Sequence, residues 1–427
     1  MRKISSFGHN FSKTAYIIIE ICYDFRRFYM QPILSVFLCL HLLICSILPL
    51  PSLISNTKEV PATESFSAEV TIASPSAVLM EASTGTIIYE KDSHTRRPPA
   101  SVTKIMTLLL IFEALEKGKI TLTDTVTVSE HAASMGGSQV FLETGETQDV
   151  ETMIKCISIA SANDASVAMA EFISGSEEAF VSQMNEKAAA LGMKDTTFIN
   201  CCGLDTDNHL TSAHDIALMS RELTIHHPQI HDYCTIWMDT ITHVTAKGSS
   251  EFGLTNTNKL IRQYEYATGL KTGSTSLAKF CLSATAKKDG MELIAVIMGA
   301  PTPKDRFSDA ASLLNYGFSK CRIYTDKNQE SLPDIPVKKG TTDTLPIEYH
   351  NEFQYLSCDG MDFSSIEKVL SLPDSVTAPV KKGDKIGEAV YRIGEKELGS
   401  TDIIAKKDMI QAVFADYMQK VLRFYFS

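Results

Sequence analysis

A serine and a lysine three residues apart are the first pair in this chain that could do chemistry. In "ASVTKIMT", which runs from Ala100 to Thr107, Ser101 precedes an apolar run with helical spacing, and Lys104 lies one turn further on. Residues three apart share a face of a helix, so the lysine amine can reach the serine hydroxyl. A serine hydroxyl becomes a good nucleophile only when a neighbouring base removes its proton. The pair therefore predicts a nucleophilic serine with a lysine base.

A lysine base must be a neutral amine at neutral pH, which requires a lowered pKa. Burial among apolar groups and a second cation nearby both disfavour the charged form. The apolar residues that follow Lys104 would provide the burial. Taken alone, the pattern also fits a solvated lysine beside a capping serine, so other segments must decide.

Two later segments contain polar residues that complement this pair. "SIASANDASVAMAEF" has Ser161 and Asn163 at the start of a helical pattern, which offers a hydroxyl and an amide on one turn. "TGLKTGSTS" puts Lys271, Thr272 and Gly273 on a strand, where glycine lets a ligand approach the backbone closely. SxxK, then SxN about sixty residues on, then KTG about a hundred further is the motif order of penicilloyl-serine enzymes.

With these motifs the chain resembles the low-molecular-mass penicillin-binding proteins that are serine-type D-Ala-D-Ala carboxypeptidases, peptidase family S11. The likeness is strong from about Ser76 to Lys320 and looser beyond. The segments that carry it include "PPASVTKIMTLLL", "LETGETQDVETMIKCISIASANDASVAMAE", "GLDTDNHLTSAHDIALMSREL", "GLKTGST" and "RFSDAASLLNYGF".

The resemblance implies catalytic roles for residues of the first two motifs. Ser101 would attack the carbonyl of the terminal D-Ala-D-Ala peptide bond, and Lys104 would accept its proton. Ser161 would relay a proton to the leaving D-alanine, while Asn163 would hold the substrate's amide and help position the lysine. Backbone N–H groups of Ser101 and Ser274 would form an oxyanion hole, typically worth about 3 kcal/mol per donor.

The third motif is implied to bind the end of the substrate. Lys271 would add positive potential, which favours a neutral Lys104 and attracts the terminal carboxylate. Thr272 would hydrogen-bond that carboxylate beside Gly273. Arg306, in "KDRFSD", matches a family arginine that assists carboxylate binding, and a structural ion pair explains this residue equally well.

The expected function is removal of the terminal D-Ala from peptidoglycan stem peptides, with no cofactor and with inhibition by β-lactams. A class A type β-lactamase is one alternative, but it needs a deacylating glutamate and usually SDN, whereas this chain has SAN at Ser161–Asn163. A non-catalytic peptidoglycan-binding scaffold is the other, because complete motifs do not prove turnover.

Strand patterns lie early and late in this part of the chain, and helical patterns lie between them. This order predicts an α/β fold, in which a mixed sheet joins both ends of the domain and a helical region is inserted. The resemblance implies the penicillin-binding-protein/β-lactamase-like transpeptidase fold. Helical spacing covers the segment after Ser101 as far as Gly118 and three segments further on. Those three run roughly over 150–174, 176–191 and 212–226. Strand patterns cover 76–91 and 266–300, before a final helix that ends near 320.

Beyond residue 328 short runs punctuated by Pro and Gly predict a small all-β domain. We expect four parts: an N-terminal extension with a signal at 1–60, the peptidase domain at 70–322, the β-rich domain at 328–407 and an amphipathic membrane-anchor helix at 408–427. In the last part, apolar residues recur every three or four positions from Ile410 to Tyr425. Such a helix can lie flat in a membrane interface, or it can pack against the β domain.

An apolar run near the N-terminus predicts export. Residues 33–55 contain no charged side chain, and basic residues precede them, namely Arg2, Lys3, Lys13, Arg26 and Arg27. This polarity is typical of a signal peptide or signal anchor, with a buried helix as the alternative. Met30 is an alternative start to Met1 and would leave a signal of ordinary length. We expect an extracytoplasmic protein attached to the outer face of the cytoplasmic membrane.

Charge and composition narrow the partners. The 427-residue chain has a formal net charge of -11, which argues against nucleic acid as a partner, because phosphate binding needs a basic surface. The grouped histidines, His226, His227 and His231, do not suggest a metal site, because Pro228 interrupts the helical face and no partner lies at ligand spacing.

Seven cysteines follow the signal region, an odd number without CxxC spacing. Neither a disulfide framework nor a zinc site is indicated, and most of these cysteines are expected to be buried thiols. Cys201 and Cys202 are adjacent where many relatives have other residues. Neighbouring cysteines rarely bond each other without strain, so small buried side chains are the first interpretation and a redox role the second.

Overall fold

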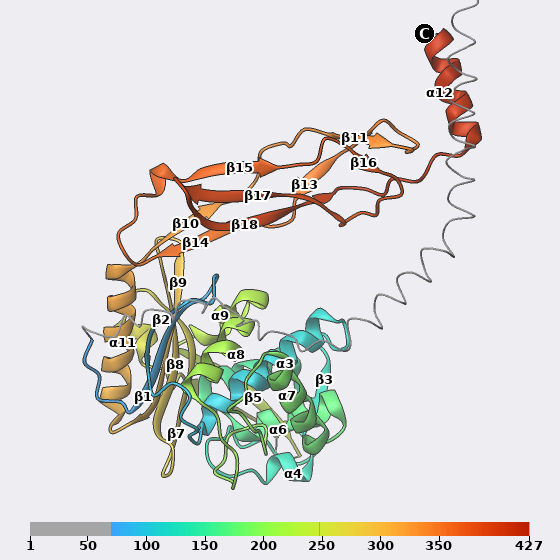
Figure 1. The fold of residues 1–427 in the computed structure, drawn as a ribbon. Helices are drawn as coiled ribbons and strands as arrows, with labels where there is room; N and C mark the ends of the chain where they lie inside the picture. The colour runs from blue at the N-terminus through green and yellow to red at the C-terminus, as the bar shows by residue number, and fades with distance from the viewer. Residues whose placement is uncertain (1–69, 247, 427) are drawn as a thin grey trace, which may run out of the picture. The chain divides into compact units, whose positions relative to one another are not determined.

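The computed structural model describes residues 70–246 and 248–426 (Figure 1). The apolar run at 33–55 and both candidate start residues lie outside the described residues.

A five-stranded sheet holds the two ends of the N-terminal part together, in the order β2-β1-β9-β8-β7. Its strands are β1 (Ser76–Glu81), β2 (Ile87–Lys91), β7 (Ala267–Thr275), β8 (Lys279–Lys288) and β9 (Met291–Ala300). The first strand pairs with the last, with Val78 opposite Val296. All four pairings are antiparallel, so the sheet is antiparallel rather than mixed as the sequence indicated. The physical reason is that short turns connect β7 to β8 and β8 to β9, and such turns join antiparallel neighbours.

Helices cover both faces of this sheet. Helix α11 packs on one face, against β8 and β9, and α8 packs on the other (Figure 1). Successive side chains of β9 alternate between the two cores, with Ile294 and Val296 in one and Leu293 and Ala295 in the other. The helices are α3 (Lys104–Glu116), α4 (Glu130–Ala133), α5 (Val150–Lys155), α6 (Asn163–Ser174), α7 (Glu177–Ala190), α8 (Ala213–His226), α9 (Ile230–Cys234), α10 (Leu260–Gln263) and α11 (Pro303–Lys320).

Helix α3 is central, as its sequence indicates. Every residue from Lys104 to Phe112 is buried, because the helix contacts α6, α7, α8 and the strand β7. A helix that is apolar on all sides is stable only inside a protein. The nucleophile and base predicted from the sequence therefore lie at the start of the most enclosed helix of the sheet domain.

The helix expected over 150–174 is interrupted. After α5 a π-helical turn, Cys156–Ala160, ends at Ser161, whose backbone is left-handed with φ 62°. Helix α6 begins two residues later at Asn163. Periodicity could not show this break, because a π turn adds one residue without changing the apolar character of the segment. The hairpin of β5 (Met238–Thr245) and β6 (Gly248–Thr255) was also missed.

The C-terminal part is all-β apart from a 3₁₀ turn, Phe363–Ser365, and its last helix. A four-stranded sheet in the order β13-β18-β17-β15 forms its largest element, and Tyr391 stacks on Phe353 in the core with ring centroids 3.7 Å apart. The other strands of this part form one three-stranded and one two-stranded sheet. In the N-terminal part, β3 (Thr125–Thr127) and β4 (Thr147–Asp149) pair as a separate two-stranded sheet. The C-terminal strands are β10 (Arg322–Asp326), β11 (Ile335–Lys338), β12 (Thr344–Leu345), β13 (Ile347–Tyr349), β14 (Phe353–Ser357), β15 (Glu367–Ser371), β16 (Val376–Thr377), β17 (Lys385–Ile393) and β18 (Lys396–Ala405).

The last helix, α12 (Phe414–Phe426), begins with exposed apolar side chains. Phe414 is 79% exposed, and Val413, Tyr417 and Val421 are also exposed. Among the described residues, no helix has both the length and the apolar character that crossing a membrane requires.

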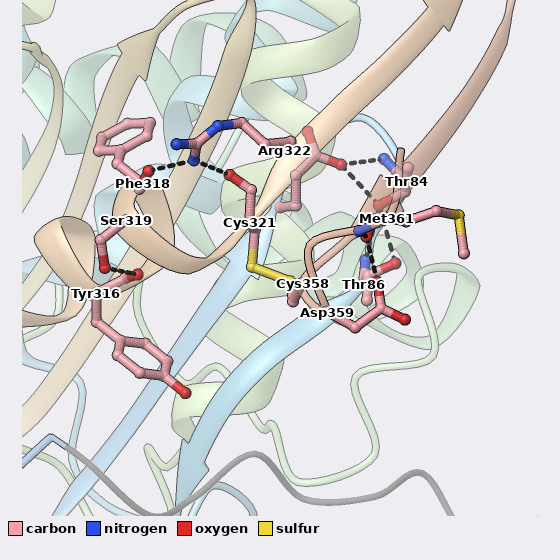
Figure 2. The surroundings of a disulfide bond; sticks show 12 residues. Thr84, Thr86, Tyr316, Phe318, Ser319, Cys321, Arg322, Cys358, Asp359 and Met361 are labelled. Atoms are coloured by element: carbon pink, nitrogen blue, oxygen red, sulfur yellow. Dashed lines mark hydrogen bonds between the residues drawn. A yellow bond between two sulfur atoms is a disulfide. The ribbon is translucent and has the colours of Figure 1, made fainter. Parts of the chain in front are cut away.

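Two of the seven cysteines form a disulfide that the sequence did not indicate. Cys321, directly after α11, is bonded to Cys358, directly after β14, and Figure 2 shows the bond beside the guanidinium of Arg322. That guanidinium donates hydrogen bonds to the carbonyl groups of Phe318 and Cys321. The pairing of β10 with β14 brings the two cysteines together, which sequence spacing could not reveal. The five other described cysteines are buried thiols.

Removing this disulfide should loosen the start of the C-terminal part. The bond closes a loop of 37 residues, so the double variant Cys321→Ser, Cys358→Ser should lose up to about 4 kcal/mol of the opening free energy of the β10–β14 pair. Hydrogen exchange of amides in β10 and β14 measures this, with amides of α3 as the internal control. Unchanged exchange in both strands would contradict the expectation.

Candidate active site

Ser101 lies in a 3₁₀ turn, Ala100–Thr103, that leads into α3. Strand β7 packs directly against this turn, because Gly273 has no side chain. A Cβ atom there would lie 2.9 Å from the backbone nitrogen of Ser101 and equally close to that of Val102. Glycine is therefore required for the third motif to lie against the first.

Lys104 is fully buried and has three oxygen neighbours. Its Nζ lies 2.6 Å from Oδ1 of Asn163, 2.7 Å from the carbonyl oxygen of Cys202 and 3.2 Å from Oγ of Ser101. Burial lowers the pKa of this lysine below its ordinary value, although nearby acidic groups oppose the shift. The site thus favours the neutral amine that a base requires.

The identity of these neighbours orients the lysine. A neutral amine has two N–H bonds and one lone pair. An amide oxygen and a backbone carbonyl accept hydrogen bonds but cannot donate them, so Asn163 and Cys202 take both N–H bonds. The lone pair then faces the one neighbour that has a proton to give, the Ser101 hydroxyl. This is the geometry of a general base.

A second buried lysine is paired with the second serine. Nζ of Lys271 donates to Oγ of Ser161 over 2.8 Å, and the left-handed backbone of this serine directs its hydroxyl out of the helical path. Burial and, to a smaller degree, the charge of Lys104 hold the pKa of Lys271 well below its ordinary value. Two buried amines this close do not both keep a proton easily, so their titrations are linked. From the sequence we expected Lys271 to carry the positive charge that favours a neutral Lys104, and this assignment stays a prediction.

Asn163 connects the lysine to a loop at residues 134–140. Its Nδ2 donates to the carbonyl of Gly136 over 2.6 Å, and its backbone N–H donates to the carbonyl of Ser138 over 2.7 Å. Gly137 has φ 81°, and a Cβ atom there would lie 2.8 Å from Nδ2 of Asn163. The loop thus fixes the amide orientation that leaves Oδ1 free for Lys104.

The other predicted binding residues belong to β7 and α11. Thr272 is buried, with its hydroxyl 2.7 Å from that of Thr257, while Ser274 is exposed. Arg306 is buried and donates from Nη1 to the carbonyl groups of Gly273 and Cys281. Its observed contacts thus hold β7 and β8, and its role toward a carboxylate stays a prediction.

Sequence reasoning missed two contributors to the site. The carbonyl of Cys202 has no residue-type signal, because every residue carries one. Thr257 lies in "NTNKL", and nothing in its residue type indicated a contact with Thr272. The histidines at 226–231 point to different partners, with His231 bonded to Glu292. Within 70–246 and 248–426 no group of three or more His, Cys, Asp or Glu could hold a metal ion.

Comparison with known proteins decides the family. The family model described as D-alanyl-D-alanine carboxypeptidase, Peptidase S11, matches residues 62–302. The chain belongs to this family. A second model, the penicillin-binding protein 5 C-terminal domain, matches residues 318–411. The predicted family and fold class are confirmed, including the all-β C-terminal domain.

Named relatives and solved structures are similar along most of this carboxypeptidase-family chain. It is 44% identical to D-alanyl-D-alanine carboxypeptidase DacF of Bacillus subtilis, over 81% of this chain and 88% of that protein. It is 30% identical to DacA of Escherichia coli, over 83% and 89%. The structure of penicillin binding protein 5 from Haemophilus influenzae matches 80% of this chain and 99% of its own with a TM-score of 0.67 and 29% identity.

Replacing the base by a permanent cation tests the role of Lys104. Lys104→Arg keeps the positive charge but cannot supply a neutral amine, so acylation by a fluorescent penicillin should fall about 100- to 10,000-fold. In the parent enzyme the acylation rate should rise with pH until the amine is deprotonated, at a pKa below the ordinary lysine value. Lys119→Arg, at an exposed position after α3, is the matched control. A rate in Lys104→Arg within threefold of the parent, roughly the error of such constants, would exclude this base.

Proposed function

We propose that this enzyme is a serine-type D-alanyl-D-alanine carboxypeptidase that trims peptidoglycan stem peptides through an acyl-enzyme on Ser101. Family membership supports the reaction class. The observation that carries the proposal for this chain is the position of Lys104, whose Nζ lies 3.2 Å from Oγ of Ser101 while its two other neighbours can only accept hydrogen bonds.

The acylation step follows from that arrangement. Lys104 takes the hydroxyl proton as Oγ of Ser101 forms a bond to the carbonyl carbon of the penultimate D-alanine. The developing oxyanion receives hydrogen bonds from the backbone N–H groups of Ser101 and Ser274. The peptide C–N bond then breaks, and Ser161, which accepts from Lys271, passes a proton to the departing amine of D-alanine.

The substrate's terminal carboxylate should also set the protonation of the two lysines. An anion beside Thr272 and Lys271 favours the charged form of Lys271. The added positive charge in turn favours a neutral Lys104, which is the state that acylation needs. Substrate binding thus prepares its own base. Water completes turnover by hydrolysing the ester on Ser101, and β-lactams acylate the same serine.

One assay separates this function from its alternatives. Soluble protein should release D-alanine from a peptide ending in D-Ala-D-Ala and form a long-lived adduct with fluorescent penicillin, and Ser101→Ala should do neither. Rapid penicillin hydrolysis would instead indicate a β-lactamase. No reaction with either compound would indicate a scaffold. As a control, Ser101→Ala should unfold at the same temperature as the parent protein. Equal unfolding temperatures show that the variant loses activity without losing its fold.

We further propose that the enzyme acts outside the cell at the membrane surface. The apolar run at 33–55 supports export, and the exposed apolar side chains of α12 support an interfacial helix. Residues Val413, Phe414, Tyr417 and Val421 recur at helical spacing and are all exposed. An apolar stripe of this kind buries itself in the interface when a membrane is present.

Acidic substitutions on the stripe should abolish membrane binding. The variant Tyr417→Glu, Val421→Glu should fail to float with anionic phospholipid vesicles, whereas the parent protein without its signal segment should float. Ala415→Glu, Gln419→Glu adds the same charge at exposed positions of α12 on the side opposite the stripe and should still float. Equal flotation of parent and stripe variant would contradict the proposal, and D-alanine release in solution should be similar in all three proteins.

A further inference from the structure

Two adjacent thiols lie directly against the base of the active site. Cys201 and Cys202 are 0% and 1% exposed, in the loop between α7 and α8. Neither side chain has a part in the chemistry described above. Gly203, the next residue, packs so closely on the first motif that a Cβ atom there would overlap the carbonyl oxygen of Ala100 at 1.9 Å. The position of this loop is therefore coupled to the position of the nucleophile.

The peptide groups of the two cysteines hold α3 in place. The carbonyl of Cys202 accepts from Nζ of Lys104 over 2.7 Å, and the carbonyl of Cys201 accepts from Oγ1 of Thr107 over 2.5 Å. The N–H of Cys202 donates to Oδ1 of Asn200 over 3.3 Å. Both polar atoms of the peptide bond that links the cysteines are thus occupied, and one of them is bonded to the catalytic helix.

The two thiols differ in acidity. Oδ1 of Asn200 lies 3.6 Å from Sγ of Cys202 and can accept its S–H. The adjacent Cys201 side chain and the charge of Lys104 lower the pKa of Cys202, whereas burial and the adjacent Cys202 raise the pKa of Cys201. Cys202 is therefore the sulfur that loses its proton more readily, which makes it the nucleophilic thiol and Cys201 the resolving one.

We propose that Cys201 and Cys202 form an oxidative modification site, at which hydrogen peroxide closes a disulfide between the two cysteines and disables Lys104 as a base. This inference rests on the proposed function. The Cys202 thiolate attacks one peroxide oxygen, the O–O bond breaks, and with one proton the products are a sulfenic acid and water. The Cys201 sulfur then attacks the sulfenic sulfur and releases a second water. Two electrons pass from sulfur to peroxide, so the step is balanced.

Ring closure must move the hydrogen bonds that position the base. Consecutive Cα atoms lie about 3.8 Å apart across a trans peptide, whereas most disulfides span about 4.4–6.8 Å. The linking peptide must therefore twist to close the ring, and it carries the carbonyl that Thr107 binds. The adjoining carbonyl of Cys202 turns with it and leaves Lys104. Without that acceptor, the lone pair of the amine is no longer held toward Ser101.

The burial of the pair selects the oxidant. Because both side chains are sealed from solvent, a large disulfide reagent cannot reach them without local opening, whereas hydrogen peroxide is little larger than water. This differs from the Cys321–Cys358 bond, which joins residues from distant parts of the chain. The parent protein for the test is therefore Cys321→Ser, Cys358→Ser, in which reductant has no other disulfide to break among the described cysteines.

The test treats this parent with hydrogen peroxide and measures acylation by fluorescent penicillin before oxidation, after it, and after dithiothreitol. We expect a loss of about tenfold or more on oxidation and recovery on reduction, as small displacements of catalytic groups cost about this much. Recovery distinguishes the disulfide from methionine oxidation, which dithiothreitol does not reverse. Mass spectrometry of the tryptic peptide 195–221, whose only cysteines are these two, should show the loss of two hydrogens.

Variants assign the effect to the pair. Cys201→Ala and Cys202→Ala should each abolish the reversible response, measured as the ratio of oxidised to reduced rate within each variant. Cys156→Ala, which removes another fully buried thiol, should retain it. A disulfide in peptide 195–221 without loss of acylation would overturn the proposal, as would peroxide treatment that leaves both thiols intact. Absence of acylation in the reduced parent would instead refute the proposed function.

Discussion

The proposed chemistry depends on one buried lysine, Lys104, whose pKa is lowered by burial. A lysine ammonium loses its hydration inside a protein, and the oxygens that neighbour Lys104 belong to a hydroxyl, an amide and a backbone carbonyl, which carry no negative charge. The protein therefore favours the amine, and the two acceptors around it determine where the lone pair points. A charged lysine in this position would lower the stability of the folded protein, whereas a neutral lysine can accept a proton.

Three glycines, Gly137, Gly203 and Gly273, let backbone segments pack closely around that amine. Gly203 lies against the turn before α3, Gly273 lies against the amide of Ser101, and Gly137 lies against the amide of Asn163. At each position a methyl group would collide with a polar atom of another motif. The glycines are thus packing requirements of the site, in addition to allowing the positive φ of Gly137 and Gly203. The apolar helices around α3 supply the rigidity that such close packing needs.

The paired lysines make the protonation of the site depend on its ligand. Lys104 and Lys271 are both buried, and the charge of Lys104 disfavours a proton on Lys271. In the proposed mechanism, a bound carboxylate would stabilise charge on Lys271 and so make the base available where a substrate is present. The proposed disulfide would act on the same amine in the opposite direction, through the carbonyl of Cys202.

Residue types and their order determined the reaction class, because SxxK, SxN and KTG specify a nucleophile, a base and an anion-binding strand that few other chemistries need together. Apolar spacing likewise determined that α3 would be buried. Tertiary structure alone decided the acceptor at Cys202, the left-handed turn at Ser161 and the Cys321–Cys358 bond. A backbone carbonyl is the same in every residue, a π turn leaves the apolar pattern intact, and a disulfide across 37 residues depends on strand pairing. None of these has a local signal, so only the folded chain can bring them into contact.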